Sequence, residues 1–563
     1  MQQEGFINME PQPMELSLQQ ESSNGGWRSA IYIIGVEIAE RFAFYGMLGN
    51  LITYLTDVLG EATATSAKNV NIWVGISTLL PLLGAVIADS FLGRLRTIFF
   101  SSIIYLMGLL MLTLSVSVEI ATQFRRQLFF LSLYIVSVGE GGHKPCVQTF
   151  GADQFSEDGP EEKKAKSSFF NWWYFGMSGG SMAATLVVPY VQDNVGWAVG
   201  YGITTVAMAI ALALFLLGRR TYQRQEPNGS PLTRVAQVFV AAGRKWRLSA
   251  GWKDGQGQGV VNNIEEGDVG SGMDAQPKSS RSLAPTNQFR FLDKATIIDD
   301  VDLSSNGRNN WRLCTVTQVE EVKLLLRLVP IWFSGLMFAV VYAQINTFFT
   351  KQGRTMDRRI GSKFHVPPAS LQVSITLTII LSVPIYDRAL VPIARKLTGI
   401  PSGVTMLQRI GIGLFLSIVG MVVAGLVEAR RIHISEEHGL LEQPKITLPM
   451  SIWWLLPQYI IWGVSDVFAA IGLTELFYDQ MPDDMRSIGS AAFLSMFGVG
   501  SLLSSFLISI VQAISSKYGD EWLGNNLNKA HLDYYYWLLA GLSTLWLGIY
   551  MGIAKFFVYK KIN

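Results

Sequence analysis

The sequence predicts an all-α membrane protein with twelve transmembrane helices, and three observations lead to that prediction. Of its 563 residues, 49% are hydrophobic and only 16% are charged, whereas an ordinary soluble chain carries about 25% charged residues. The mean hydropathy is +0.29. Twelve apolar stretches are long enough to cross about 30 Å of hydrocarbon, which takes roughly 20 residues in a helix. The chain is therefore expected to cross the membrane many times.

Each apolar stretch is an expected membrane-spanning helix, and the order of the stretches indicates two halves. The expected spans are 29–58, 70–91, 97–118, 127–150, 168–191, 197–218, 322–350, 369–392, 405–427, 449–478, 487–513 and 532–558. Glycine and proline inside several of them are tolerated where neighbouring helices satisfy the freed backbone groups. Six spans precede a long polar segment and six follow it, so we expect two six-helix bundles.

The polar segment sets the domain boundaries. We expect a disordered cytosolic tail (1–28), an N-terminal bundle (29–218), a cytosolic linker (219–321), a C-terminal bundle (322–558) and a short cytosolic tail (559–563). The middle of the linker is rich in Gly, Ser and Asp, which is typical of a flexible connection. Thr317 and Glu320 have the spacing of a capping box just before the seventh span. Residues 1–26 contain no Lys or Arg, so the first tail does not resemble a targeting segment.

The orientation follows from the distribution of Lys and Arg. Seven basic residues and one Glu lie between Arg219 and Arg247, which places the linker, and with it both termini, in the cytosol. The basic loop at 351–363 runs against this count, but the even number of spans and the central linker outweigh it. The tail holds no decisive sorting signal, so the plasma membrane and the vacuolar membrane both remain open.

Composition and residue spacing also argue against several classes of function. A net charge of +2 gives no basis for a nucleic-acid partner. Two cysteines predict no disulfide framework, and five scattered histidines without Cys/His spacing predict no metal site. Because no nucleophile–base set or nucleotide loop is present, we expect neither an enzyme nor a cofactor other than a coupling proton.

The first span carries three charged residues at helical spacing. Glu37, Glu40 and Arg41 stand at positions i, i+3 and i+4, so they share one helix face. Each ionised group near the bilayer centre costs several kcal/mol, by contested estimates, unless it is paired or hydrated. One carboxylate is left over after pairing with Arg41, which favours a proton-titrating cluster that faces a cavity. The alternative is a structural ion pair that holds helices together.

Two further charges lie inside later spans. Lys144 follows glycines at the end of the fourth span, where it is either a cavity cation or an interfacial lysine. Asp466 is the single acid in the apolar part of the tenth span, and a lone carboxylate there needs a partner. Lys144 has the opposite sign, so we expect a Lys144–Asp466 bridge that forms in one access state and breaks in the other. The seventh span has only neutral polar groups, among them Tyr342 and Gln344.

At these residues the chain resembles a known family. The matching motifs are E-x-x-E-R-F at 37–42, G-x-x-x-A-D-x-x-x-G-x-x-x-T-I at 84–98, G-G-x-K-P-C…F-G-A-D-Q-F at 141–155, and the runs at 169–175, 352–358 and 456–459. They are similar to those of the plant nitrate-and-peptide transporters, in the proton-dependent oligopeptide transporter branch of the major facilitator superfamily. The resemblance covers about 28–558 and implies a major facilitator fold of twelve helices in two six-helix halves.

The resemblance also implies roles for individual residues. Glu37, Glu40 and Arg41 match the proton-coupling cluster, and Lys144 matches a lysine whose partner is an acid on span seven or ten. Ala343 stands where peptide transporters have the span-seven glutamate, which leaves Asp466 as that partner. The substrate or gate set comprises Lys144, Asp466, Tyr45, Tyr342 and Gln344.

Two more positions are compared with a dual-affinity nitrate member of the family. Tyr342 stands in place of its nitrate-binding histidine. Thr97 matches its phosphorylated threonine and follows Arg94-Leu-Arg96, which implies a protein kinase as a partner.

The sequence therefore predicts a proton-coupled symporter that works by alternating access within the lipid bilayer. Nitrate or di- and tripeptides are the leading small-molecule substrates. The alternatives are transport of a plant hormone or glucoside, or a nutrient sensor with little transport.

Overall fold

The structure is a computed structural model that describes residues 25–118, 121–155, 160–223, 231–247, 286–298, 309–361, 364–399, 403–481, 486–519 and 521–557. Most of the expected first tail, the glycine-rich middle of the linker and the expected tail 559–563 lie outside the described residues. The described chain is mostly helical and divides into two compact units whose segments alternate along the sequence.

Unit 1 comprises Met1–Glu61, Leu80–Asn228 and Arg358–Val373. Its helices are α2 (Gly26–Leu48), α3 (Leu51–Thr53), α5 (Arg94–Ser117), α6 (Thr122–Ala152), α7 (Pro160–Asn194) and α8 (Trp197–Leu217). Its short π or 3-10 turns are η1 (Tyr54–Val58), η2 (Ala88–Leu92), η3 (Gly218–Arg220) and η6 (Pro368–Gln372). Strands β2 (Arg359–Ile360) and β3 (Phe364–His365) pair antiparallel, with Arg359 opposite His365. Helix α4 (Thr63–Ile87) belongs to this unit from Leu80 onward.

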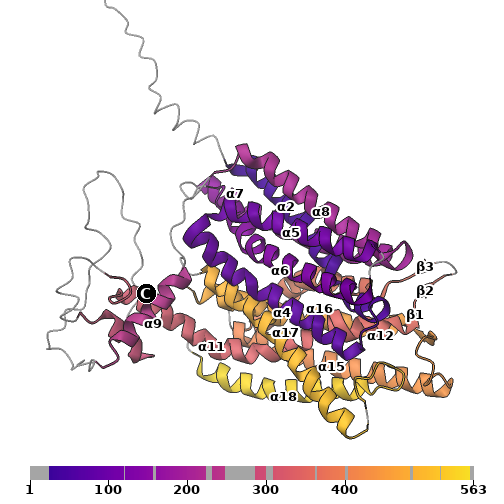
Figure 1. Ribbon diagram of the computed structural model, residues 1–563. Helices are drawn as coiled ribbons and strands as arrows, with labels where there is room; N and C mark the ends of the chain where they lie inside the picture. The colour runs from indigo at the N-terminus through magenta and orange to yellow at the C-terminus, as the bar shows by residue number, and fades with distance from the viewer. Residues whose placement is uncertain are drawn as a thin grey trace, which may run out of the picture. The chain divides into compact units, whose positions relative to one another are not determined.

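Helix packing in unit 1 brings α2 and α6 into one bundle. Helix α2 packs against α7 and α8, and α5 packs against α6 and α8 (Figure 1). Two glycines allow α6 to approach its neighbours closely. A Cβ at Gly84 of α4 would lie 2.0 Å from the carbonyl oxygen of Gly141, and one at Gly139 would lie 2.5 Å from the amide nitrogen of Tyr105. Side chains at these positions would force the backbones apart, so glycine sets the position of α6 around residue 140.

Unit 2 comprises Ala62–Leu79, Gly229–Asp357 and Ser374–Asn563. Its helices are α4 up to Leu79, α9 (Pro231–Arg244), α11 (Val316–Tyr342), α12 (Thr350–Arg354), α13 (Val373–Ile385), α14 (Val391–Thr398), α15 (Met406–Glu437), α16 (Leu456–Asp479), α17 (Arg486–Lys517) and α18 (Leu532–Phe556). Its short turns are η4 (Arg290–Thr296), η5 (Ile345–Phe349), η7 (Tyr386–Leu390) and η8 (Ile452–Leu455). Strands β1 (Met356–Asp357) and β4 (Leu448–Ser451) pair in parallel, with Met356 opposite Leu448.

In unit 2, helix α15 packs against α16 and α18, while α11 packs against α17 and α18 (Figure 1). The ends of the expected linker are ordered against α11. Helix α9 and η4 bury Val238, Leu292 and Val322 in a common apolar cluster. This cluster fixes the described part of the linker to the first turns of α11.

The start of α11 corrects one expectation. The capping box uses Thr315, whose side chain accepts from the backbone N–H of Gln318, while the Gln318 side chain accepts from Thr315. The expected pair of Thr317 and Glu320 was therefore wrong by two residues. Instead, Glu320 accepts hydrogen bonds from Thr286 and Lys323, so its carboxylate ties the linker to α11.

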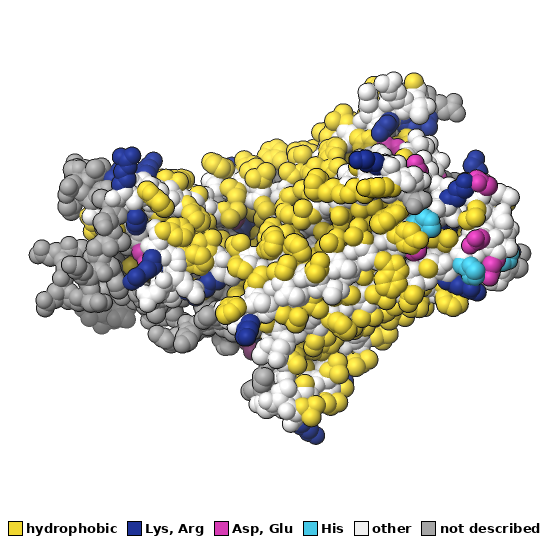
Figure 2. Space-filling view, turned by 90° about the horizontal axis from the view of Figure 1, so that it is seen from below, with side chains coloured by type: hydrophobic (Ala, Val, Ile, Leu, Met, Phe, Trp, Pro, Cys, Tyr) yellow, Lys and Arg dark blue, Asp and Glu magenta, His cyan; other side chains and the backbone are white. Residues whose placement is uncertain are grey.

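Nine helices in the described part of the chain are long and apolar enough to cross a membrane. The expected spans 29–58, 127–150 and 168–191 coincide with α2, α6 and α7, which are not among the nine; α2 and α6 carry several charged residues. Large apolar side chains are exposed on many helices, including Ile31, Phe100 and Leu545, and hydrophobic side chains cover much of the face seen in Figure 2. Exposed apolar helix faces of this kind are what contact with lipid tails requires.

Candidate functional site

The three charged residues of α2 form a buried ionic cluster in unit 1. Arg41 Nε lies 3.1 Å from a Glu37 oxygen and 2.5 Å from a Glu40 oxygen. All three side chains are at most 4% exposed. The helical spacing read from the sequence therefore brings these residues together, with one guanidinium between two carboxylates.

Helix α6 adds a second ion pair to unit 1. Lys144 Nζ donates to Glu140 Oε1 at 3.1 Å, one helical turn away. Glu140 is fully buried, whereas the Lys144 side chain is 22% exposed. In this structure the local counter-ion of Lys144 is therefore Glu140, and the expected bridge to Asp466 stays a prediction.

An aromatic side chain joins the two ion pairs. The Arg41 guanidinium lies 5.7 Å from the centre of the Phe44 ring, and Lys144 Nζ lies 5.2 Å from it. Both cations are therefore within range of a cation–π contact with the same ring. Tyr45 packs edge-on against Phe44 and is half-buried. Tyr45 thus lies next to the charged residues of unit 1.

The remaining predicted residues lie in unit 2. Asp466 on α16 is 8% exposed, and its Oδ1 has no hydrogen-bond partner among the described residues. Tyr342 on α11 packs against Trp462 and Phe497, with ring centres 6.1 and 5.3 Å apart. Trp462 precedes Asp466 by one turn of the same helix. Unit 2 therefore places Trp462 and Asp466 on neighbouring turns of α16, with the Tyr342 ring of α11 packed against Trp462.

Gln344 follows Tyr342 by two residues, just after the end of α11. Its amide nitrogen donates to the Val340 carbonyl oxygen at 3.0 Å and to Ser504 Oγ at 3.1 Å, and its side chain is fully buried. Ser504 also accepts from Asn71. The donor group of Gln344 is thus engaged with protein groups.

Thr97 lies in the first turn of α5, beside an acid–base group. Its side chain is 5% exposed and its hydroxyl donates to the Gly93 carbonyl oxygen at 2.9 Å. Arg94 pairs with Asp89 at 3.3 Å and also with Asp153. Burial raises the pKa of the Asp153 carboxyl above its usual range, and Arg94 opposes that change. Arg94 thus has two acidic partners while Thr97 is unmodified.

This geometry gives an expectation for Thr97→Asp. A charge at a buried first-turn position must reach Arg94 or stay unpaired, so the first turn of α5 has to open. We expect a change in transport rate or affinity for Thr97→Asp and little change for Thr97→Ser, which keeps the hydroxyl. Uptake kinetics, normalised to protein at the membrane, measure this. Parental kinetics in both Thr97→Asp and Thr97→Ala would contradict a regulatory role for Thr97.

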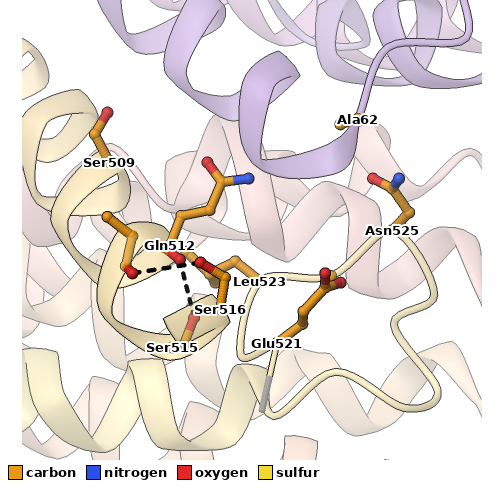
Figure 3. Close-up of a pocket in the computed structure, with 10 residues that line it drawn as sticks. Ala62, Ser509, Gln512, Ser515, Ser516, Glu521, Leu523 and Asn525 are labelled. Carbon is orange, nitrogen blue, oxygen red and sulfur yellow. Dashed lines mark hydrogen bonds between the residues drawn. The ribbon is translucent and has the colours of Figure 1, made fainter. Parts of the chain in front are cut away.

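A cavity of about 400 Å³ lies elsewhere in unit 2 (Figure 3). Polar side chains at the end of α17 and in the following loop line it, including Gln512, Glu521 and Asn525. None of the predicted site residues lines this cavity. Among the described residues, no group of His, Cys, Asp or Glu is placed to hold a metal ion.

Sequence reasoning missed Glu140. The signal was present, because Glu140 and Lys144 are four residues apart on one helix, the spacing of an intrahelical ion pair. The prediction for Lys144 considered an acid on another helix and left out Glu140 on the same helix.

The fold resembles that of solved transporters. The crystal structure of an auto inhibited POT family peptide transporter superposes with a TM-score of 0.68 at 22% identity, covering 94% of this chain and 97% of that one. The in meso crystal structure of the POT family transporter PepTSo also gives 0.68 at 22% identity, covering 94% and 98%. Buried charges within helices of such a fold are typical of secondary transporters.

The chain belongs to the POT family, whose sequence pattern matches residues 95–526. It is 54% identical to Protein NRT1/ PTR FAMILY 5.4 of Arabidopsis thaliana, over 97% of each chain. It is 49% identical to Protein NRT1/ PTR FAMILY 5.10 of the same plant, over 96% of this chain and 95% of the relative. The resemblance found in the motifs is therefore confirmed: the protein is a membrane transporter with plant relatives, not a member of an enzyme family.

Proposed function

We propose that the protein is a proton-coupled symporter of a small polar solute, with nitrate or di- and tripeptides as the leading substrates. The observation that carries this proposal is the buried cluster of Glu37, Glu40 and Arg41, because two carboxylates that share one guanidinium leave a site for a proton inside the bilayer. Lys144 supplies a partly accessible cation in the same unit.

The proposal includes the finer architecture. Twelve helices in two six-helix halves would alternate access to the substrate, with both termini in the cytosol. The six-plus-six order of apolar stretches and the basic residues of the linker support this arrangement. The plasma membrane and the vacuolar membrane remain the two locations to distinguish.

The charge of unit 1 limits how an anion can bind. Glu37, Glu40 and Glu140 oppose Arg41 and Lys144, so these five buried or partly buried groups are formally −1. Two unit charges 4 Å apart interact by about 4 kcal/mol at an effective dielectric constant of 20, so a bound anion needs at least one carboxylate to be protonated.

A pH dependence of nitrate binding follows. If nitrate is carried, its apparent affinity should improve as the pH falls, and Glu37→Gln with Glu40→Gln should flatten that dependence. Tyr342→His should strengthen nitrate binding at acidic pH, because an imidazolium adds positive charge that a phenol cannot supply below about pH 10. Nitrate affinity measured against pH in all three proteins tests this. Tight parental binding at alkaline pH would contradict it.

A substrate screen tests the function itself. Nitrate, dipeptides, a plant hormone and a glucoside are applied at acidic and neutral pH to oocytes that express the protein, and currents and uptake are recorded. We expect inward current and uptake for one class, larger at acidic pH. A plant hormone or glucoside as the responding class would support the alternative substrate. Binding without turnover by any compound would support a nutrient sensor instead.

A further inference from the structure

Glu140 is a buried carboxylate for which the proposed symport has no role so far. It lies on α6 between glycines and is fully buried. One oxygen accepts from Lys144 at 3.1 Å, and Oε2 has no hydrogen-bond partner among the described residues. One of the two carboxylate oxygens of Glu140 is thus buried in unit 1 without a hydrogen bond to the described residues.

Charged and titratable groups on three helices face Glu140. Lys144 lies on its own helix, Glu40 and Arg41 act on it from α2, and Tyr105 is near it on α5. Glu37 is within electrostatic range as well, and the His143 side chain beside it is fully buried. Arg41 is in contact with both carboxylates of α2. Lys144 is therefore the cation in hydrogen-bond contact with Glu140.

The two partners of this ion pair differ in their access to open space. The Glu140 side chain is 0% exposed, while the Lys144 side chain is 22% exposed. The ammonium group is on a long flexible stem and can turn toward a ligand, whereas the short carboxylate is fixed by the glycine-packed part of α6. Lys144 can therefore exchange partners, and Glu140 cannot follow it.

We propose that Glu140 is the resting counter-ion of Lys144 and that a proton on Glu140 releases Lys144 to bind an anionic group of the substrate, either nitrate or a carboxylate. This inference rests on the proposed symport. The proton forms an O–H bond on the carboxylate, and the ionic contact with Nζ breaks while Lys144 keeps its charge. The anion then takes the place of the carboxylate. When the proton leaves toward the cytosol, the carboxylate binds Lys144 again and displaces the anion.

The proposal predicts effects of opposite sign for the two partners. Glu140→Gln imitates the protonated acid, so it should bind an anion at neutral pH as well as the parent does at acidic pH. Each linked proton changes the affinity by about tenfold per pH unit within its titration range, so the variant should lose the factor that the Glu140 proton contributes and keep any dependence that the α2 carboxylates contribute. Lys144→Ala should bind weakly at both pH values. A purely structural role for Glu140 would weaken binding and would not raise it at neutral pH.

The experiment uses the purified full chain in lipid nanodiscs, with nitrate and alanyl-alanine as separate probes. Affinity is measured at acidic and neutral pH for the parent, Glu140→Gln, Glu140→Asp and Lys144→Ala. Glu140→Asp retains a titratable group and should keep the pH dependence. Glu320→Gln is the matched control, because Glu320 is also buried and paired with a lysine on its own helix, Lys323. It should behave like the parent.

A second measurement needs no substrate. Infrared difference spectra between acidic and neutral pH should show a protonated-carboxylic-acid band in the parent that is smaller in Glu140→Gln and unchanged in Glu320→Gln. The band reports protonation of Glu140 even in the absence of transport. The symport proposal fails separately, if the parent shows no proton-driven transport. A parental spectrum unchanged by Glu140→Gln, or weaker anion binding by that variant at neutral pH, would overturn the role of Glu140. If Glu140→Gln does not fold, loss or shift of the band in Lys144→Ala supports the pairing, and an unchanged band contradicts it.

Discussion

Glu40→Gln is expected to abolish uphill, proton-driven accumulation of substrate, while exchange down the substrate's own gradient persists. Glu40 is fully buried and in contact with Arg41. The amide imitates a carboxylic acid that cannot lose its proton, so a cycle in which this carboxylate has to release its proton cannot be completed. Each pH unit corresponds to about 1.4 kcal/mol per proton, so the parent can reach roughly tenfold accumulation of a neutral solute per pH unit and the variant should fall to equilibration.

The control for this prediction is Glu320→Gln. It removes a different buried carboxylate, which is paired with Lys323 near the start of α11, and it should leave the accumulation ratio unchanged. Uptake into vesicles with an imposed pH gradient measures both variants. Normal accumulation by Glu40→Gln at acidic pH would show that this carboxylate does not carry the coupling proton.

Of the substitutions proposed here, Arg431→Met is expected to lower the free energy of unfolding the most. The guanidinium is fully buried and binds the Glu428 carboxylate through two nitrogens at 2.7 and 2.8 Å. It also donates to Asn528 at 2.9 Å and to the Leu527 carbonyl oxygen at 2.5 Å. These bonds join α15 to the loop before α18. Removal of one partner of a buried pair costs about 3–5 kcal/mol, because the other charge stays buried and uncompensated.

The companion variants separate charge from packing. Arg431→Met with Glu428→Leu removes both charges and should recover part of the stability. Lys529→Ala breaks an exposed pair with Glu442 near the same loop and should cost less than about 1 kcal/mol. Thermal unfolding in detergent, together with the amount of protein at the membrane, gives the comparison. Equal losses for Arg431→Met and Lys529→Ala would contradict the role assigned to the buried pair.

The sequence predicted the helices and the α2 cluster because both depend on local spacing. Apolar stretches of sufficient length form helices, and residues at i, i+3 and i+4 share a face whatever packs against them. Glu37, Glu40 and Arg41 therefore meet in the structure as expected. The family was also identified correctly, because its motifs are long runs of contiguous residues.

The details that depend on competition between similar partners were not predicted. Two overlapping capping boxes begin at Thr315 and Thr317, and the choice depends on the residue at which the backbone leaves its extended conformation. The partner of Lys144 could be an acid on its own helix or one far away in sequence, and spacing alone does not rank Glu140 against Asp466. The π-helical turns and two-residue strands have no sequence period of their own.

Coupled movement of substrate and proton should be visible as acidification of the vesicle lumen. The purified full chain is placed in liposomes that contain a pH-sensitive dye, and an inward gradient of nitrate, or of alanyl-alanine in a second series, is imposed without a pH gradient. We expect the substrate that enters to acidify the lumen, and Glu40→Gln to abolish the acidification. Substrate entry with no change in luminal pH in the parent would contradict it.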